Sequence, residues 1–201
     1  MMKQLAFLIL WTCFSVPLMA QDTQLKQVEL KLGAQSTVAE GYVSLNKAAV
    51  YTDIEGYYYS PDIDFIYLHG KTSGANLMVP SHDRGLRAFS KSLLSKVSAW
   101  KQRNPGIFIK LNGNDSEKIF SDAKTDADLI RLFNTNYTEI KNIEDYDPLL
   151  NGPGERLTHL EAGDVVLFKS GVKNLYAIGY ISSIEHPGTR GTLTMVLKYK
   201  Q

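Results

Sequence analysis

The chain has 201 residues, of which 44% are hydrophobic, with 22 Lys and Arg against 21 Asp and Glu. A near-neutral chain without a block of basic residues argues against binding to nucleic acid or to an anionic membrane surface. Its single cysteine, Cys13, excludes a disulfide within the chain, so stability has to come from buried surface.

The first twenty residues, MMKQLAFLILWTCFSVPLMA, have the layout of a cleavable signal peptide. Lys3 supplies the positive charge, and Leu5 to Phe14 form an apolar run that is too short to span a bilayer stably. Ala20 is a small residue at the expected cleavage point. Cys13 lies inside the apolar run, whereas a lipid-acceptor cysteine would follow a small residue at its end. We therefore predict cleavage before Gln21.

Removal of residues 1–20 takes away Lys3 and leaves 21 basic against 21 acidic side chains, so the exported chain is neutral. No later apolar segment approaches the length of about 18 residues that a membrane span needs. We predict a single α+β domain over residues 21–201, periplasmic or extracellular, with no membrane insertion after cleavage.

The first half of the domain is predicted to be mostly strands. VELKL (28–32) alternates apolar and polar residues, and YVSLNKAAVY (42–51) reads as a second extended segment. DIDFIYLHG (62–70) is apolar on both faces, as a strand in the middle of a sheet is. A short glycine-containing turn joins it to ANLMV (75–79), which predicts a hairpin.

A helical period then replaces the strand period. Apolar residues recur at spacings of three and four between 84 and 103, which predicts one helix of about five turns with Leu93 and Val97 buried against the sheet. IFIKL (107–111) reads as a strand. Two shorter helices are expected, one beginning at Asp115 or Ser116, and one capped by Thr125 with Asp128 at the capping-box position.

A polar loop is expected from 142 to 158, and the last forty residues read as three strands joined by short turns. In the final strand one set of residues is predicted to be buried (Leu193, Met195, Leu197, Tyr199). The alternate set is predicted to face water (Thr192, Thr194, Lys198, Lys200). The order of elements predicts an α+β fold: a largely antiparallel sheet, packed by one long and one or two short helices, with a C-terminal three-stranded meander.

The stretch from Asp62 to Asp83 contains two of the four histidines, His69 and His82. Metal ligands have to converge on one point. His69 falls at the turn end of one hairpin strand, while His82 lies beyond the far end of the other. We therefore interpret the stretch as a hairpin with polar ends and predict no metal site and no cofactor.

The chain also lacks the short motifs of nucleophilic, nucleotide-binding and zinc-dependent enzymes, such as G-x-S-x-G and H-E-x-x-H. The acidic residues from Glu144 to Asp147 do not follow the calcium-loop pattern, and we interpret them as a solvated loop. A carboxylate pair for glycoside hydrolysis stays open, because such pairs are assembled in space rather than in sequence.

Tyrosine is the one enrichment, with eleven in the chain and three in a row at Tyr57, Tyr58 and Tyr59. On a strand, consecutive side chains point to opposite faces, so at least one of the three should reach solvent. Exposed aromatic rings stack on sugar rings and anchor protein interfaces. The alternative is that tyrosine simply suits strands. These three residues, which we expect at a sheet edge or in a loop, are the candidate ligand-binding site.

The order of KLGAQS, AVYT, DIDFIYLHG with GANLMVPSHD, WKQRN, GIFIKL and AGDVVLFKSGVKNLYAIGYISSI resembles that of uncharacterised secreted proteins and lipoproteins of Bacteroidetes bacteria. The resemblance covers nearly the whole of residues 21–201 and rests on these patterns rather than on a catalytic signature. It implies export. It carries over no functional residues, and the lipid-acceptor cysteine of many members is missing here.

These observations favour a non-catalytic binding or assembly module of the cell envelope over an enzyme, with a glycan or an envelope protein as its partner. Two alternatives stay open: an extracellular hydrolase whose site is assembled in space, and a structural or inhibitory protein.

Overall fold

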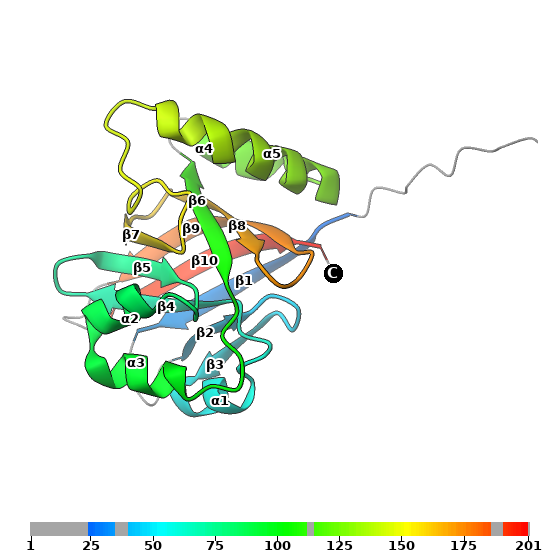
Figure 1. The fold of residues 1–201 in the computed structure, drawn as a ribbon. Coiled ribbons are helices and arrows are strands. Elements are labelled where there is room, and N and C mark those ends of the chain that lie inside the picture. The colour runs from blue at the N-terminus through cyan, green and yellow to red at the C-terminus, as the bar shows by residue number, and fades with distance from the viewer. Residues whose placement is uncertain (1–23, 35–39, 112–114, 186–190, 201) are drawn as a thin grey trace, which may run out of the picture.

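The structure is a computed structural model that describes residues 24–34, 40–111, 115–185 and 191–200 (Figure 1). Within these ranges the chain forms ten strands, five α-helices and one short 3-10 helix. The strands make two five-stranded sheets in which every neighbouring pair is antiparallel. The predicted α+β fold with antiparallel pairing is confirmed. The predicted signal peptide lies outside the described residues.

The first sheet contains the predicted C-terminal meander. Its strands are β1 (Lys26–Gly33), β6 (Gly106–Leu111), β8 (Val165–Ser170), β9 (Tyr176–Glu185) and β10 (Thr192–Tyr199). They lie in the order β1-β10-β9-β8-β6, so the last three strands are neighbours in space as in sequence. In β10 the alternation predicts the inward face correctly, because its four apolar residues named above are at most 2% exposed.

The second sheet contains the predicted hairpin. Its strands are β2 (Glu40–Ser44), β3 (Ala49–Thr52), β4 (Phe65–Gly70), β5 (Gly74–Met78) and β7 (Arg156–Leu160). They lie in the order β3-β2-β4-β5-β7, so β4 is the middle strand, as its apolar character on both faces predicts. β4 pairs with β5 from Ile66 opposite Met78 to Gly70 opposite Gly74.

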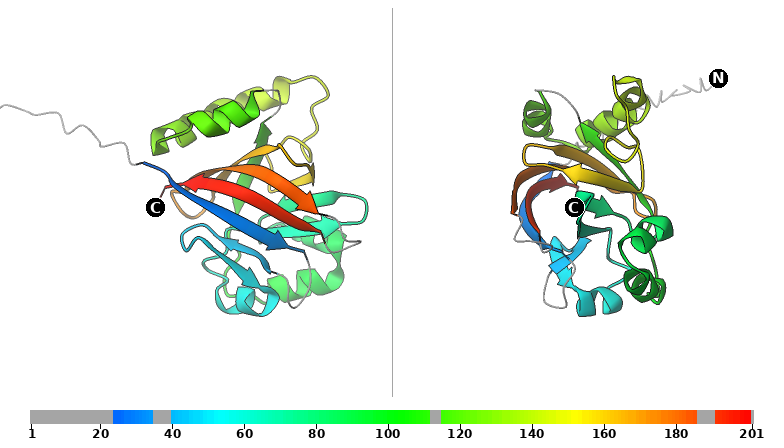
Figure 2. Two further views of the ribbon diagram at one scale, coloured as in Figure 1. Left: turned by 180° about the vertical axis from the view of Figure 1, so that it is seen from behind. Right: turned by 90° about the vertical axis from the view of Figure 1, so that its left-hand side faces the viewer.

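The two sheets face each other and share one apolar core (Figure 2). Phe65 of the second sheet packs edge-on against Phe108 and Phe168 of the first, with ring centroids 5.8 and 5.6 Å apart. At one side the sheets are joined through the backbone, since Phe108 and Gly154 exchange hydrogen bonds of 2.8 and 3.1 Å just before β7 begins. The two sheets therefore form one packed unit.

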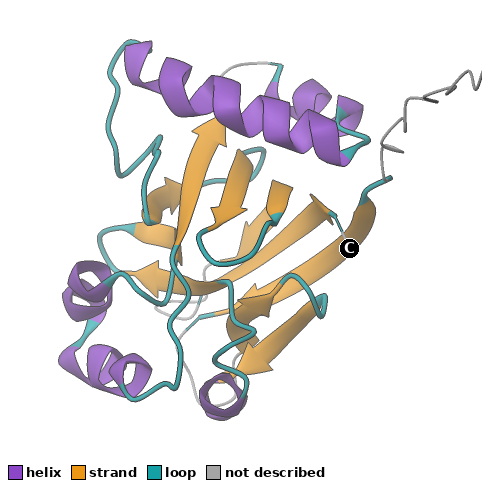
Figure 3. Ribbon diagram, turned by 45° about the vertical axis from the view of Figure 1, so that its right-hand side comes forward, coloured by secondary structure: helices purple, strands orange, loops and turns teal. Residues whose placement is uncertain are grey.

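Helices cover the outer face of each sheet (Figure 3). They are α1 (Asp53–Tyr58), α2 (Asp83–Phe89), α3 (Lys91–Ser98), α4 (Ser116–Asp122), α5 (Asp126–Glu139) and the 3-10 helix η1 (Ile140–Asn142). α4 and α5 pack on the first sheet, and α1, α2 and α3 lie at the second. The helices thus form the two outer layers around the paired sheets.

The prediction of one continuous helix between 84 and 103 is wrong, because two helices form there. Ser90 has an extended backbone, with φ −167° and ψ 152°, and separates α2 from α3. Its hydroxyl oxygen accepts a hydrogen bond of 2.9 Å from the backbone N–H of Leu93, which caps the start of α3. The longest of the described helices is instead α5, which begins at the predicted capping box of Thr125 and Asp128.

The predictions for residues 42–51 and 142–158 are also wrong. The single segment predicted for 42–51 is a hairpin, in which Tyr42 pairs with Tyr51 and Ser44 with Ala49. The loop predicted for 142–158 ends early, because β7 begins at Arg156 and pairs with β5. Five residues of mixed polarity carry too weak a periodic signal to predict β7 from sequence.

Lys198 is a fourth correction, because it was expected to face water and is only 6% exposed. Its ammonium group donates to the backbone carbonyls of Phe120, Ser121 and Ala123 at 2.7, 3.2 and 3.1 Å. These carbonyls lie at the end of α4, where a helix lacks partners of its own and favours a positive charge. β10 is therefore covered on both faces at this residue.

Candidate functional site

The candidate site is centred on α1, the short helix that contains two of the three consecutive tyrosines. Thr52 and Glu55 form a capping box at its start: the Thr52 hydroxyl accepts from the N–H of Glu55 at 3.3 Å, and the Glu55 carboxylate accepts from the N–H of Thr52 at 2.9 Å. The carboxylate accepts from the N–H and from the hydroxyl of Thr52, and these two hydrogen bonds hold the pKa of Glu55 below its ordinary value. The spacing of Thr52 and Glu55 is the sequence signal that would have predicted a helix here.

Gly56 sets how closely α1 lies against the protein. It is the one buried residue of α1. A Cβ atom at this position would lie 3.1 Å from the Tyr42 ring and 3.4 Å from the Trp100 ring. These two rings meet edge-on with centroids 5.3 Å apart, so the helix rests directly on a rigid aromatic pair. A larger residue would require the Tyr42 ring to shift by a few tenths of an ångström, so glycine favours this close approach.

Asp53 ties α1 to two further elements. The Tyr42 hydroxyl on β2 donates a hydrogen bond of 2.6 Å to Asp53, and Lys96 on α3 forms an ion pair with the same carboxylate. Burial raises the pKa of Tyr42, and the hydrogen bond to Asp53 and its charge raise it further. α1 is thus fixed at its first turn as well as at Gly56.

This rigid helix presents a group of exposed aromatic side chains. Tyr57, Tyr58 and Tyr59 are 53, 73 and 47% exposed, and Ile54, one turn before them, is 63% exposed. Tyr59 stacks on Tyr51 with centroids 4.7 Å apart and an interplanar angle of 18°. Tyr57 and Tyr58 meet edge-on at 5.5 Å. We call these five side chains the tyrosine surface.

Most of the exposed large apolar side chains of the described residues belong to the tyrosine surface. Among the described residues, seven large hydrophobic side chains are exposed, and four of them lie between Ile54 and Tyr59. Isolated exposed hydrophobic residues are normal on a protein surface, but a contiguous group indicates a contact surface. The tyrosine surface therefore stands out from the rest of the described exterior.

Two carboxylates lie beside this surface. Burial raises the pKa of Tyr51, and the nearby charges of Asp62 and Glu55 and the neighbouring Tyr59 raise it further. The backbone N–H of Asp62 donates to the carbonyl of Tyr59 at 2.8 Å, which holds the segment after α1 in place. Aromatic rings and hydrogen-bond acceptors are thus presented together.

The sequence prediction for Tyr57, Tyr58 and Tyr59 was right about solvent access and wrong about secondary structure. At least one ring was expected to be exposed, and all three are. They were expected at a sheet edge or in a loop, whereas they form the end of α1 and its C-cap. Their role in ligand binding stays a prediction.

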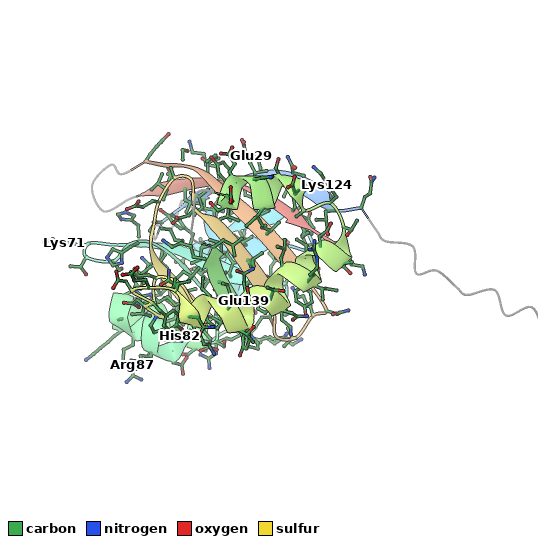
Figure 4. The ribbon with its side chains drawn as sticks, turned by 90° about the horizontal axis from the view of Figure 1, so that it is seen from above. Glu29, Lys71, His82, Arg87, Lys124 and Glu139 are labelled. Carbon is green, nitrogen blue, oxygen red and sulfur yellow. The ribbon has the colours of Figure 1, made fainter. Side chains whose placement is uncertain are left out.

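The two histidines of the hairpin lie at its opposite ends, as predicted. His69 is opposite Ala75 next to the turn, whereas His82 follows the far end of β5 and lies 3.0 Å from Glu155. Figure 4 shows Lys71, at the hairpin tip, well away from His82 beside α2. Within the described ranges, no three His, Cys, Asp or Glu side chains are grouped to hold a metal.

The acidic residues after α5 form a loop. Asp147 accepts a hydrogen bond of 2.7 Å from the N–H of Leu149 and donates its own N–H to the Asn151 side chain at 2.9 Å. The carboxylate therefore caps a local turn.

None of the helices that the structure describes is long and apolar enough to cross a membrane.

Comparison with known proteins gives one structural likeness. No protein-family model and no curated protein matches the chain. A crystal structure of a DUF4466 family protein from Parabacteroides merdae superimposes with a TM-score of 0.54 at 15% identity. The match covers 88% of this chain and 54% of that one, so the present chain spans about half its length.

At this identity the likeness shows the fold alone. It agrees with the resemblance to uncharacterised Bacteroidetes proteins, because the neighbour is a protein of such a bacterium. It assigns no residue, ligand or cellular location to the chain. Export and the absence of a lipid anchor stay predictions.

Proposed function

We propose that this protein is an exported, non-catalytic binding module of the cell envelope, and that its tyrosine surface binds carbohydrate. The observation that carries the proposal is the gathering of exposed tyrosines on a short helix that is fixed from three sides. Binding to a fixed surface loses less conformational entropy than binding to a mobile loop. The first twenty residues of the sequence support the export part of the proposal.

Carbohydrate suits the chemistry of this surface. Aromatic rings cover the apolar face of a sugar, while hydroxyl and carboxylate oxygens bind its hydroxyl groups. Tyr57 and Tyr58 supply rings and hydroxyls, and Glu55 and Asp62 supply acceptors close by. Lys96, the nearby cation on α3, is paired with Asp53, which makes it less available to an acidic ligand. A neutral polysaccharide fits these features better than an anionic one.

The proposal can be tested with the exported protein by affinity electrophoresis in gels that contain neutral α-glucan, β-glucan, mannan or xylan. The wild type is expected to be retarded by at least one polysaccharide. The triple variant Tyr57→Ala, Tyr58→Ala, Tyr59→Ala should run as it does in a gel without polysaccharide, with its melting temperature kept. Val172→Ala, which shortens an exposed apolar side chain elsewhere, is the matched control and should behave as wild type.

A second comparison separates stacking from hydrogen bonding. Tyr58→Phe keeps the ring and should keep most of the retardation, whereas Tyr58→Ala should lose it. Retardation of the triple variant equal to that of wild type would contradict the proposed site. Wild type that none of the four polysaccharides retards would contradict the carbohydrate ligand. A shift of the wild type with envelope proteins alone would indicate a protein partner instead.

A further inference from the structure

A cavity of about 470 Å³ lies between α5 and the first sheet, in a different layer of the fold from the tyrosine surface. α5 packs here against the outer strand β6 and its neighbour β8. Its lining comes from all three elements and from the turn after β8: Ile107, Phe133, Asn134, Tyr137, Lys169, Ser170 and Gly171. The volume is within the range of small-molecule sites, about 300–1,000 Å³.

Lys169 is the charged group of this cavity, and its place in β8 is unusual. The alternate residues Val165 and Leu167 point to the same face and pack into the apolar cluster under α5. Lys169 continues this stripe and lies opposite Ile107 of β6 on one side and Tyr176 of β9 on the other. An ammonium group therefore takes a position where the two preceding side chains are apolar.

The neighbours of this ammonium group are aromatic. The Nζ atom of Lys169 lies 5.3 Å from the centre of the Tyr176 ring and 5.8 Å from that of Phe133. Such contacts stabilise a cation modestly and leave its hydrogen-bond donors unused. The rings thus hold the Lys169 charge in place without neutralising it.

No carboxylate neutralises Lys169 within the described part of the chain. Seven ion pairs occur there, and Lys169 takes part in none of them. The cavity lining contains no Asp or Glu, and a second cation, Lys141, lies 5.3 Å from the ring centre of Tyr137 at the rim. The local charge is therefore positive.

We propose that this cavity binds a small organic anion with a flat apolar body, such as an aromatic carboxylate. Lys169 pairs with the carboxylate of the ligand, and the half-buried position of this lysine strengthens the pairing. The apolar body lies against Phe133 and Tyr137, whose rings stack with centroids 6.0 Å apart. The amide of Asn134 and the hydroxyl of Ser170 supply polar contacts at the edge. This site is independent of the tyrosine surface.

The test uses two probes of nearly the same shape, 2-naphthoate and its uncharged amide, with binding to the exported protein measured by calorimetry. Wild type is expected to bind naphthoate at least about tenfold more tightly than the amide, because a hydrogen bond between ionised groups is stronger than one between neutral groups. Added salt should weaken the binding of naphthoate more than that of the amide.

Four variants locate the effect. Lys169→Met keeps the apolar stem and should abolish the preference for naphthoate, whereas Lys169→Arg should keep it. Tyr137→Ala changes an exposed ring at the rim and should weaken both probes about equally. Lys118→Met removes an exposed lysine from α4 and should change neither. The melting temperature of each variant verifies folding, and Tyr137→Ala keeps the test valid if Lys169→Met is unstable.

Each of three outcomes would overturn the proposal. The first is a wild type that binds neither probe. The second is a wild type that binds the two probes equally, which would show an apolar groove without a role for the charge. The third is a folded Lys169→Met variant that still prefers naphthoate, which would place the anion elsewhere.

Discussion

The ammonium nitrogen of Lys173 lies 2.9 Å from Oδ1 of Asp64, and this ion pair joins the two sheets. Lys173 is in the turn between β8 and β9 of the first sheet, and Asp64 directly precedes β4 of the second. Asp64 is fully buried, and its other oxygen accepts a hydrogen bond of 2.8 Å from the N–H of Leu45. Lys173 also donates to the carbonyl of Asp62 at 3.0 Å.

The first prediction concerns this pair. Lys173→Met should lower the free energy of unfolding by about 3–5 kcal/mol, because it leaves a buried carboxylate without its cation. Asp64→Asn in the same background should restore most of the loss, since the amide oxygen still accepts from Leu45 and carries no charge. Urea denaturation at pH 7 measures both. A double variant as unstable as Lys173→Met would show that the buried charge is not the cause.

A lower pH should also raise the stability of the Lys173→Met variant. Burial raises the pKa of Asp64, against the opposing effect of Lys173, so the folded state binds this proton more tightly than the unfolded state does. The contribution of Asp64 to stability therefore increases as pH falls from its raised folded-state pKa towards about 4. The stability that Lys173→Met loses at pH 7 should be partly recovered at pH 5.

The second prediction has the opposite sign, because the pKa of Asp128 is lowered, to about 2. The causes are its hydrogen bonds from the N–H of Lys124, from the hydroxyl and N–H of Thr125, and from Arg131. Its contribution to stability is present above about pH 4 and is lost as pH falls through about 2.

Asp128→Asn should therefore cost about 1 kcal/mol at pH 6, and the difference from wild type should shrink towards pH 2. Denaturation curves at a series of pH values test this. Glu117→Gln, on the exposed side of α4, is the control and should not change the stability of the wild type at pH 6 by more than about 0.5 kcal/mol. A difference that stays constant over the whole series would contradict the capping role of the charge.

The strands whose local pattern matches their burial could be predicted from sequence. β10 alternates cleanly, and β4 is apolar on both faces because it is the middle strand. β7 could not be predicted, since its pairing with β5 joins residues about eighty positions apart and its own pattern is weak. Lys198 shows the same limit, because the helix that covers it is distant in sequence.

The break between α2 and α3 was hidden for a different reason. The apolar spacing continues across Ser90, from Leu86 and Phe89 to Leu93 and Val97, so the periodicity is the same for one helix or two. Only the capping preference of serine indicates the break, and serine also occurs within helices. For the candidate site, the exposure of at least one of the three tyrosines could be predicted from the sequence. The cavity at Lys169 could not be predicted, because it depends on how α5 crosses β8.

The third prediction is that Lys198 stabilises the end of α4. Lys198→Met keeps the aliphatic stem but leaves the three carbonyls of that helix end without their donor. The free energy of unfolding should fall by about 1–3 kcal/mol. Lys200→Met, which removes the partly exposed ion pair with Asp126, should cost about 1 kcal/mol or less. Urea denaturation that ranks the two variants in reverse order would contradict the capping role.

The fourth prediction distinguishes the two helices α2 and α3 from a single continuous helix. Leu86 is fully buried, whereas Leu93, which the single-helix interpretation placed in the core, is only half-buried. Leu86→Ala should cost about 2–5 kcal/mol, and Leu93→Ala about 1–1.5 kcal/mol, because part of its side chain stays in water. Ser90→Ala should cost about 1 kcal/mol through the lost cap of α3. Lys91→Ala, on the exposed side, should stay within about 0.5 kcal/mol.

The last prediction concerns alkaline pH and the support of α1. The pKa of Tyr42 is raised by burial first, and then by its hydrogen bond to Asp53 and the charge of that carboxylate. In the unfolded chain the phenol loses its proton near pH 10, whereas the folded protein keeps it. Stability should therefore fall as pH rises above about 10. Burial also raises the pKa of Tyr67 and Tyr199, so they contribute to the same fall.

Tyr42→Phe should lower the free energy of unfolding at pH 8 by about 1–2 kcal/mol, because it removes the donor to Asp53. It should also make the decrease between pH 8 and 10.5 shallower, since the phenylalanine ring cannot ionise. Asp53→Asn keeps an acceptor and removes the charge, so its pH dependence should lie between those of wild type and Tyr42→Phe. If wild type and Tyr42→Phe lose stability in parallel over this range, Tyr42 ionises as readily in the folded protein as in the unfolded chain. That result would contradict the role of the contact between Tyr42 and Asp53 in holding α1 in its observed position.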